Sequence, residues 1–134
     1  MAEKSNYEKV KEFHEIFGCT VGDESNPGFV NLFDPALRIK LIKEEYTELA
    51  EAIEQNHDNT EIAKELADLL YVVYGTGVSM GINLDKVFKV VHDSNMSKLD
   101  DDGKPIYNSY GKVIKSDNYR QPNLSELIHG RTKT

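Results

Sequence analysis

The chain has 134 residues, of which 39% are hydrophobic, and its formal net charge is −7. This length predicts one domain with its own core, and the acidic balance argues against binding to nucleic-acid polymers. The longest uncharged run, residues 69–82, is too short and too rich in glycine to span a bilayer, and no signal-peptide core opens the chain, so we expect a cytoplasmic protein that binds no membrane.

The first predicted element is a helix over about residues 6–17. Ser5 stands three residues before Glu8, which is the spacing of a capping box, and Gly18 is placed to end the helix. Cys19 follows as the only cysteine, which excludes an internal disulfide and a zinc site of several thiolates within one chain. We expect Cys19 to be a small buried residue beside this helix.

A loop rich in glycine, proline and asparagine separates this helix from a second one. Asp34 and Pro35 are expected to form its N-cap and first turn, and the helix should run to about Gln55. A third helix is predicted over about residues 61–80, with Gly81 at its end.

The fourth helix and a short β appendage complete the predicted chain. Apolar residues at helical spacing predict the helix over about residues 84–97, with Asn83 as its cap. Short β-prone pieces and turn residues then indicate a hairpin and an extended tail over about residues 99–134. The predicted fold class is all-α: a four-helix bundle in a single domain of residues 1–134, with a helical core over about residues 6–98.

The second helix places two acidic residues on its apolar face. At about 100° per residue, Glu45 and Glu48 fall within the arc of apolar side chains. Three other glutamates of this helix fall outside the arc and can face water: Glu44, Glu51 and Glu54. An inward carboxylate is costly unless it is protonated, paired with a cation or bound to metal.

The third helix is apolar on nearly every side, yet it carries Glu65 and Asp68 on a shared face near its start. Lys64 is adjacent to Glu65, so we expect it to point elsewhere. Four carboxylates from two adjacent helices would form an oxygen-rich cage of the kind that Mg²⁺ or Mn²⁺ prefers. In the alternative interpretation, these acids lie at the edge of the core and pair with Lys or Arg from elsewhere in the chain.

The fourth helix ends in an amide and a cation. Asn95 and Lys98 continue the apolar stripe that contains Val87 and Val91, so they could receive a phosphate chain held by the metal. A frayed polar helix end explains the same pattern equally well.

Two segments resemble the motifs of a known superfamily. "KEEYTEL" (residues 43–49) and "ELADLLY" (residues 65–71) look like the EExxE and ExxD motifs of the all-α NTP pyrophosphohydrolases, which include MazG, dimeric dUTPases and phosphoribosyl-ATP pyrophosphohydrolase. Residues 91–122 are similar to a branch of short MazG-like proteins that includes a bacterial dUTPase. The resemblance covers about residues 8–122.

The resemblance implies hydrolysis of a (deoxy)nucleoside triphosphate to the monophosphate and pyrophosphate. It implies dUTP as the first choice of substrate, with dGTP, dATP or a modified dNTP as alternatives. Mg²⁺, or Mn²⁺ in its place, would neutralise the phosphates and activate a water, while one glutamate takes the proton. The implied metal ligands, of which the first two are also assigned to catalysis, are Glu45, Glu48, Glu65 and Asp68.

The resemblance also implies contacts to the nucleotide. The positions assigned to phosphate or ribose are Asn95, Lys98, Lys115, Tyr119 and Arg120. The candidates for a base pocket, which could equally be core packing, are Phe13, His14 and Phe17.

Two other classes of protein fit parts of the sequence. Di-iron carboxylate bundles use ExxH motifs, and such motifs occur at residues 54–57 and 126–129. A helical interaction module would use the acids only structurally. We also expect a homodimer or a dimer of dimers, because a four-helix domain of this length covers only part of the apolar third helix, and because the resemblance implies nucleotide pockets built across subunits.

Overall fold

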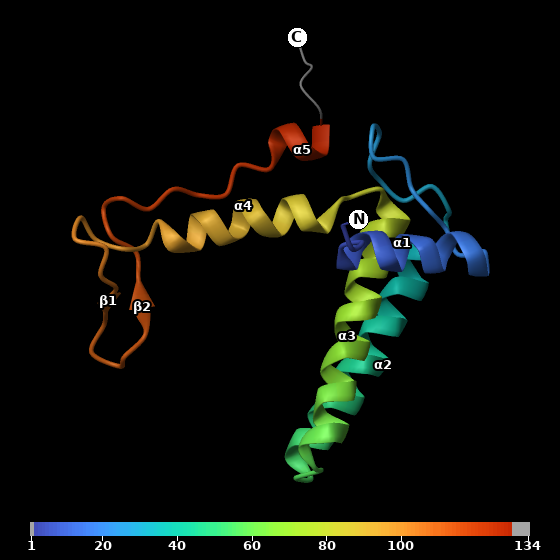
Figure 1. Ribbon diagram of the computed structural model, residues 1–134, viewed down its shortest axis with the longest axis horizontal. Helices are drawn as coiled ribbons and strands as arrows, with labels where there is room; N and C mark the ends of the chain where they lie inside the picture. Colours follow the sequence, from blue (N-terminus) through green and yellow to red (C-terminus); the bar gives the residue numbers. More distant parts are fainter. Residues whose placement is uncertain (1, 130–134) are drawn as a thin grey trace. The chain divides into compact units, whose positions relative to one another are not determined.

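The computed structural model describes residues 2–129 of the chain, which form five helices and one two-stranded sheet (Figure 1). The helices are α1 (Asn6–Phe17), α2 (Asp34–Glu54), α3 (Asn59–Met80), α4 (Leu84–Met96) and α5 (Ser125–His129), and the strands are β1 (Ile106–Tyr107) and β2 (Val113–Ile114). This confirms the predicted all-α class with a short hairpin. The chain divides into two compact units, residues 1–84 and 85–134. None of the described helices is long and apolar enough to cross a membrane.

Helix α1 begins and ends as predicted. The Ser5 hydroxyl accepts a hydrogen bond from the Glu8 amide at 3.2 Å, and the Ser5 amide donates to Glu8 Oε1 at 2.8 Å. Gly18 ends the helix with a φ of 77°, a left-handed conformation that glycine adopts without strain. The prediction for Cys19 is wrong, because its side chain is exposed. The buried side chain at this end of α1 is His14.

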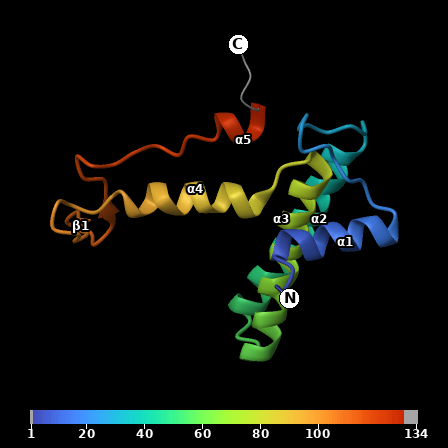
Figure 2. The same ribbon diagram turned by 45° about the horizontal axis from the view of Figure 1, so that its top comes forward.

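Helices α2 and α3 lie side by side along most of their lengths in both views (Figures 1 and 2). The N-cap of α2 is Phe33, not Asp34. Asp34 is already helical, and its carboxylate accepts from the Thr20 hydroxyl at 3.4 Å instead of capping the amides of its own helix. Helix α3 starts two residues earlier than predicted because the Asp58 side chain caps it, accepting from the Glu61 amide at 3.0 Å.

The core of the first unit lies where α1 meets the C-terminal half of α3. Tyr7, Val10 and Val78 are fully buried there, and Leu84 packs against them. Toward its N-terminal half, the apolar surface of α3 is only partly covered. Leu66 and Leu70 are 49% and 55% exposed.

The loop between α1 and α2 is held on the C-terminal end of α3. The amide of Gly22 donates to the Val78 carbonyl, and the amide of Gly28 donates to the Met80 carbonyl, both at 2.8 Å. The last carbonyls of a helix have no amide donors within the helix. The loop supplies donors to two carbonyls at the end of α3. A Cβ on Gly22 would lie 2.7 Å from the Ser79 carbonyl oxygen, so only glycine fits.

The second unit joins α4 to the hairpin and the tail. The strands pair antiparallel, with Ile106 opposite Ile114. The turn between them is closed by the Asn108 side chain, which accepts from the amides of Tyr110 and Lys112. The tail is not extended throughout, because residues 125–129 form α5. Residues 130–134 of the predicted tail lie outside the described residues.

Candidate functional site

Three of the four predicted metal ligands come together between α2 and α3. One carboxylate oxygen from each of Glu45, Glu65 and Asp68 can be chosen so that all lie within 4.8 Å of one another. Glu65 is buried, with 6% of the whole residue exposed, and Glu45 and Asp68 are half-buried. The helix pair therefore gathers acidic groups from two segments at one point along its seam.

Glu48, the fourth predicted ligand, is exposed and is not among the three residues whose oxygens converge. Burial raises the pKa of Glu45, and the charges of Glu48 and Asp68 raise it further. The charge of Glu48 also contributes to the raised pKa of Glu65. The negative charge of Glu48 therefore acts on the cluster, although its side chain is open to water.

Glu65 carries the clearest sign of an unmet interaction. Its Oε1 atom is buried and accepts no hydrogen bond from any residue within 2–129. Burial raises the pKa of this carboxyl, and the Glu61 carboxyl one turn earlier raises it further. Carboxylate oxygens are the ligands that Mg²⁺ and Mn²⁺ prefer, and a buried oxygen without a partner is the kind of atom that a metal satisfies. The residues therefore fit such an ion.

The prediction that Lys64 points away from the cluster is wrong. Its Nζ lies 2.7 Å from Asp68 Oδ2 and 4.0 Å from Glu65 Oε1. The hydrogen bond to Asp68 raises the pKa of Lys64. Lys64 and Asp68 are four residues apart, a spacing that brings side chains together on a helix and that would have identified the pair in the sequence. The same spacing links Glu61 to Glu65.

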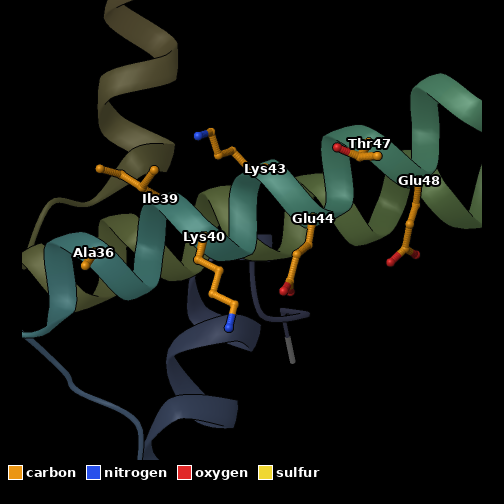
Figure 3. Close-up of a pocket in the computed structure, with 7 residues that line it drawn as sticks. All are labelled: Ala36, Ile39, Lys40, Lys43, Glu44, Thr47 and Glu48. Atoms are coloured by element: carbon orange, nitrogen blue, oxygen red, sulfur yellow. The ribbon is translucent and has the colours of Figure 1, made fainter.

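A groove of about 690 Å³ runs along the exposed face of α2 (Figure 3). It is lined by Ala36, Ile39, Lys40, Lys43, Glu44, Thr47 and Glu48. Lys40, Glu44 and Glu48 project to one side of the helix, and Lys43 projects to the other (Figure 3). Within the described chain, neither Lys40 nor Lys43 forms an ion pair of 4.0 Å or less.

The base-pocket candidates on α1 lie in two different environments. The rings of Phe13 and Phe17 stack with centroids 4.3 Å apart, and Phe13 meets the edge of Tyr71 at 5.6 Å. Tyr71 follows Asp68 by three residues on α3, so this aromatic group lies about one helical turn from the carboxylates. His14 is instead 3% exposed, with Nδ1 2.8 Å from the Thr20 carbonyl oxygen.

His14 belongs to a buried polar network that the sequence did not reveal. Arg38, 6% exposed, donates from Nε to the Thr76 hydroxyl at 3.1 Å and from its terminal nitrogen to the Val72 carbonyl at 2.9 Å. A Cβ on Gly75 would collide with Arg38 and lie 3.0 Å from His14 Nε2. Arg38 therefore joins α2 to α3, and Gly75 leaves room for it. No sequence signal marks this arginine as buried.

The other predicted nucleotide contacts lie in the second unit. Asn95 is exposed on α4, and Lys98 is half-buried just after it. Lys115 places its ammonium 4.5 Å from the centre of the Tyr119 ring. The backbone of Arg120 is fixed at the end of α4, because its carbonyl accepts from the Ser94 hydroxyl at 2.7 Å and its amide donates to the Ser97 hydroxyl at 2.9 Å.

The ExxH motifs of the di-iron alternative find no support in the described part of the chain. His57 is exposed, with Nε2 3.3 Å from the Gln55 side-chain oxygen. Within residues 2–129, the converging group of potential metal ligands is the acidic one on α2 and α3, and it contains no histidine.

Comparisons with known proteins identify the family. Residues 10–95, which contain both acidic motifs, match the family model of phosphoribosyl-ATP pyrophosphohydrolase. The chain is also 34% identical over 119 residues to Uncharacterized protein L479 of Acanthamoeba polyphaga mimivirus, an alignment that covers 84% of this chain and 43% of that protein. The chain thus spans less than half the length of this relative. It belongs to the phosphoribosyl-ATP pyrophosphohydrolase family, part of the MazG-like superfamily of all-α NTP pyrophosphohydrolases.

Proposed function

We propose that the protein is a metal-dependent pyrophosphohydrolase that converts a nucleoside triphosphate to the monophosphate and pyrophosphate. Membership of the family implies a nucleotide pyrophosphohydrolase in general. The observation that carries the finer proposal is the convergence of Glu45, Glu65 and Asp68 to within 4.8 Å between two helices. Three hard oxygen ligands at one point suit Mg²⁺ or Mn²⁺.

We assign metal binding and proton acceptance to different acidic residues according to their exposure to water. Glu65 is buried and Glu45 and Asp68 half-buried, which suits fixed ligands. A bound metal would neutralise phosphate charge and lower the pKa of a coordinated water. Glu48 is exposed and its charge raises the pKa of Glu45, so among the predicted ligands it is the one that water reaches most easily. We assign it the proton that leaves the attacking water as the phosphoanhydride bond breaks.

The surroundings of the cluster supply contacts for the rest of the nucleotide. Lys40 and Lys43 stand in the groove that ends at Glu48, where their charges suit a phosphate chain. The stacked pair of Phe13 and Phe17, which touches Tyr71, offers aromatic faces to a base. From the resemblance alone, we also propose phosphate or ribose contacts for residues of the second unit: Asn95, Lys98, Lys115, Tyr119 and Arg120.

We propose dUTP as the first substrate, on the resemblance of residues 91–122 to a dUTPase branch. The alternatives are dGTP, dATP or a modified dNTP, with which the protein would shape a phage or cellular nucleotide pool. Phosphoribosyl-ATP enters the comparison because the matching family carries its name.

Pyrophosphate release tests this function. The purified protein is assayed with Mg²⁺ and with Mn²⁺ against canonical and modified nucleoside triphosphates and phosphoribosyl-ATP. We expect metal-dependent release of pyrophosphate, with dUTP giving the highest kcat/KM. Turnover that persists in excess EDTA contradicts the metal dependence. A protein that hydrolyses none of these substrates would instead be the helical interaction module.

A further inference from the structure

Lys64 is the cation that the structure places on the carboxylate cluster. Its Nζ lies 2.7 Å from Asp68 and 4.0 Å from Glu65. Both are among the three residues whose oxygens converge. Across residues 2–129, no other Lys or Arg forms an ion pair of 4.0 Å or less with these two carboxylates.

The surroundings of this ion pair differ from those of a surface pair with the same spacing. On α4, Lys89 and Asp93 are also four residues apart and 3.0 Å from each other, and their side chains are 77% and 56% exposed. Lys64 is similarly exposed at 63%, but the side chains it contacts are not: Asp68 is 38% exposed and Glu65 is 8% exposed. Lys64 therefore lies next to one carboxylate that water reaches poorly, that of Glu65, whereas both members of the α4 pair are open to water.

A divalent cation and the ammonium of Lys64 compete for the same oxygens. Two positive charges a few ångströms apart repel each other, and the repulsion is strongest where water is excluded. The exposed, flexible stem of Lys64 lets the ammonium leave by rotating about its own side-chain bonds, without moving α3. A phosphate group brought to the cluster by a bound cation would then be within reach of the long side chain of Lys64.

We propose that Lys64 is an exchangeable counterion: it neutralises Glu65 and Asp68 until a divalent cation binds, and it then binds the phosphate chain of the substrate. This inference rests on the proposed function, because the phosphate in question is that of the nucleotide. It gives one residue two effects of opposite sign. Removing the ammonium strengthens metal binding and weakens phosphate binding, a combination that a purely structural role of Lys64 does not produce.

The test compares Lys64→Met, which keeps most of the side chain but removes its charge, with Lys64→Arg and with the matched control Lys89→Met. Methionine is a good helix former, so α3 is retained. Calorimetry first measures Mn²⁺ affinity without nucleotide. We expect Lys64→Met to bind Mn²⁺ about 3- to 10-fold more tightly than wild type, and Lys89→Met to match wild type.

The second measurement is the affinity for inorganic pyrophosphate at saturating Mg²⁺, a probe that needs no base recognition. We expect the affinity for pyrophosphate to fall about 5- to 10-fold in Lys64→Met. It should be largely retained in Lys64→Arg, because lysine and arginine side chains both bind phosphate. Mn²⁺ affinity that is unchanged or weaker in Lys64→Met overturns the counterion role. Pyrophosphate affinity equal to that of wild type overturns the phosphate role.

Failure of the proposed function is a separate result. A wild-type protein that binds Mn²⁺ and pyrophosphate but hydrolyses no nucleotide overturns the enzyme assignment and leaves the comparison of Lys64 variants decisive. A wild-type protein that binds no divalent cation overturns both.

Discussion

Each carboxylate of the cluster has its own environment, and this environment sets what a mutation there does. Glu65 is buried, with an oxygen that accepts no hydrogen bond within residues 2–129, Asp68 accepts from Lys64, and Glu48 is open to water. The proposed divalent cation would be held by the negative charge of these carboxylates, whereas packing depends mainly on their volume. Neutral substitutions of equal size therefore separate function from stability.

The first prediction concerns these neutral substitutions. Asp68→Asn and Glu48→Gln should each reduce kcat by about 100-fold or more, because they remove the charge of a proposed metal ligand or of the proposed proton acceptor without opening a cavity. Glu51→Gln and Glu54→Gln are the controls, since both residues are exposed on the same helix. Steady-state kinetics measure the loss of kcat, and thermal melts show whether the variants remain folded. Activity near wild type in either site variant would show that the site is elsewhere.

His14 gives a prediction about pH. Burial lowers the pKa of its imidazole below the ordinary value of 6.5, Arg38 lowers it further, and the Thr20 carbonyl and Asp34 oppose the shift. As pH falls below 6.5, the unfolded chain takes up a proton at this position while the folded chain does not. The unfolded state is then favoured, so the free energy of unfolding contributed by His14 is lost toward acid.

Denaturant unfolding measured from about pH 7.5 down to about pH 5 tests this expectation. In His14→Gln the amide can still donate to the Thr20 carbonyl but does not titrate, so the loss of stability toward acid should be smaller than in wild type. His57→Gln, at an exposed position, should leave the pH dependence unchanged. A pH dependence in His14→Gln identical to that of wild type would contradict the assignment.

At single residues, the sequence predicts side-chain direction best where helical periodicity places a charged group on an apolar face, because burial of that charge is costly. The inward direction of Glu65 follows from its helix alone, since α3 offers it almost no polar face. The direction of Lys64 does not follow from its position next to Glu65, because its long side chain reaches along the helix to Asp68, one turn further on. The burial of Arg38 depends on the space above Gly75, which exists only once α2 and α3 are packed.

At the scale of elements, the ends of helices are set by local chemistry. Ser5, Gly18 and Gly81 fix their helix ends as the sequence predicts, because capping is decided within a few residues. The predicted N-cap of α2, Asp34, is one residue too late. The Asp34 carboxylate instead accepts a hydrogen bond from Thr20. The sequence could not show that partner, which lies in a loop.

The same loop gives a prediction for Gly22. A side chain there meets only backbone atoms of the α3 C-terminus, which cannot rotate away. Gly22→Ala should therefore cost about 1–3 kcal/mol or more of the unfolding free energy, as overpacking does. Gly18→Ala is the comparison, because its Cβ meets open space and the cost is only the left-handed backbone, about 1 kcal/mol. Denaturation curves that rank Gly18→Ala as the more damaging change would contradict this view of the loop.

At the scale of the whole molecule, apolar surface remains uncovered. Leu66, Leu70 and Val73 form a stripe at helical spacing along α3, with 49%, 55% and 37% of each exposed. Ile16 and Phe17 on α1 are exposed to 71% and 67%. Surface of this kind is normally buried in an assembly, which supports the proposal of a homodimer or a dimer of dimers.

An assembly of this kind links stability to protein concentration. The midpoint of thermal unfolding should rise as protein is added, because association stabilises only the folded chain. Leu70→Asp should lower the assembled mass measured by light scattering, whereas Val30→Asp, at an exposed loop position, should not. A fully active species at 15.2 kDa, the mass of one chain, would contradict the proposal.

The loop pinned to the end of α3 also affects how protons exchange with water. Loop amides usually exchange fast because water reaches them, whereas amides bonded inside a stable unit exchange only when that unit opens. The amides of Gly22 and Gly28 are donors to α3 carbonyls. Although they lie outside any helix or strand, their exchange is tied to the opening of α3, so this loop and the core helix behave as one unit of local unfolding.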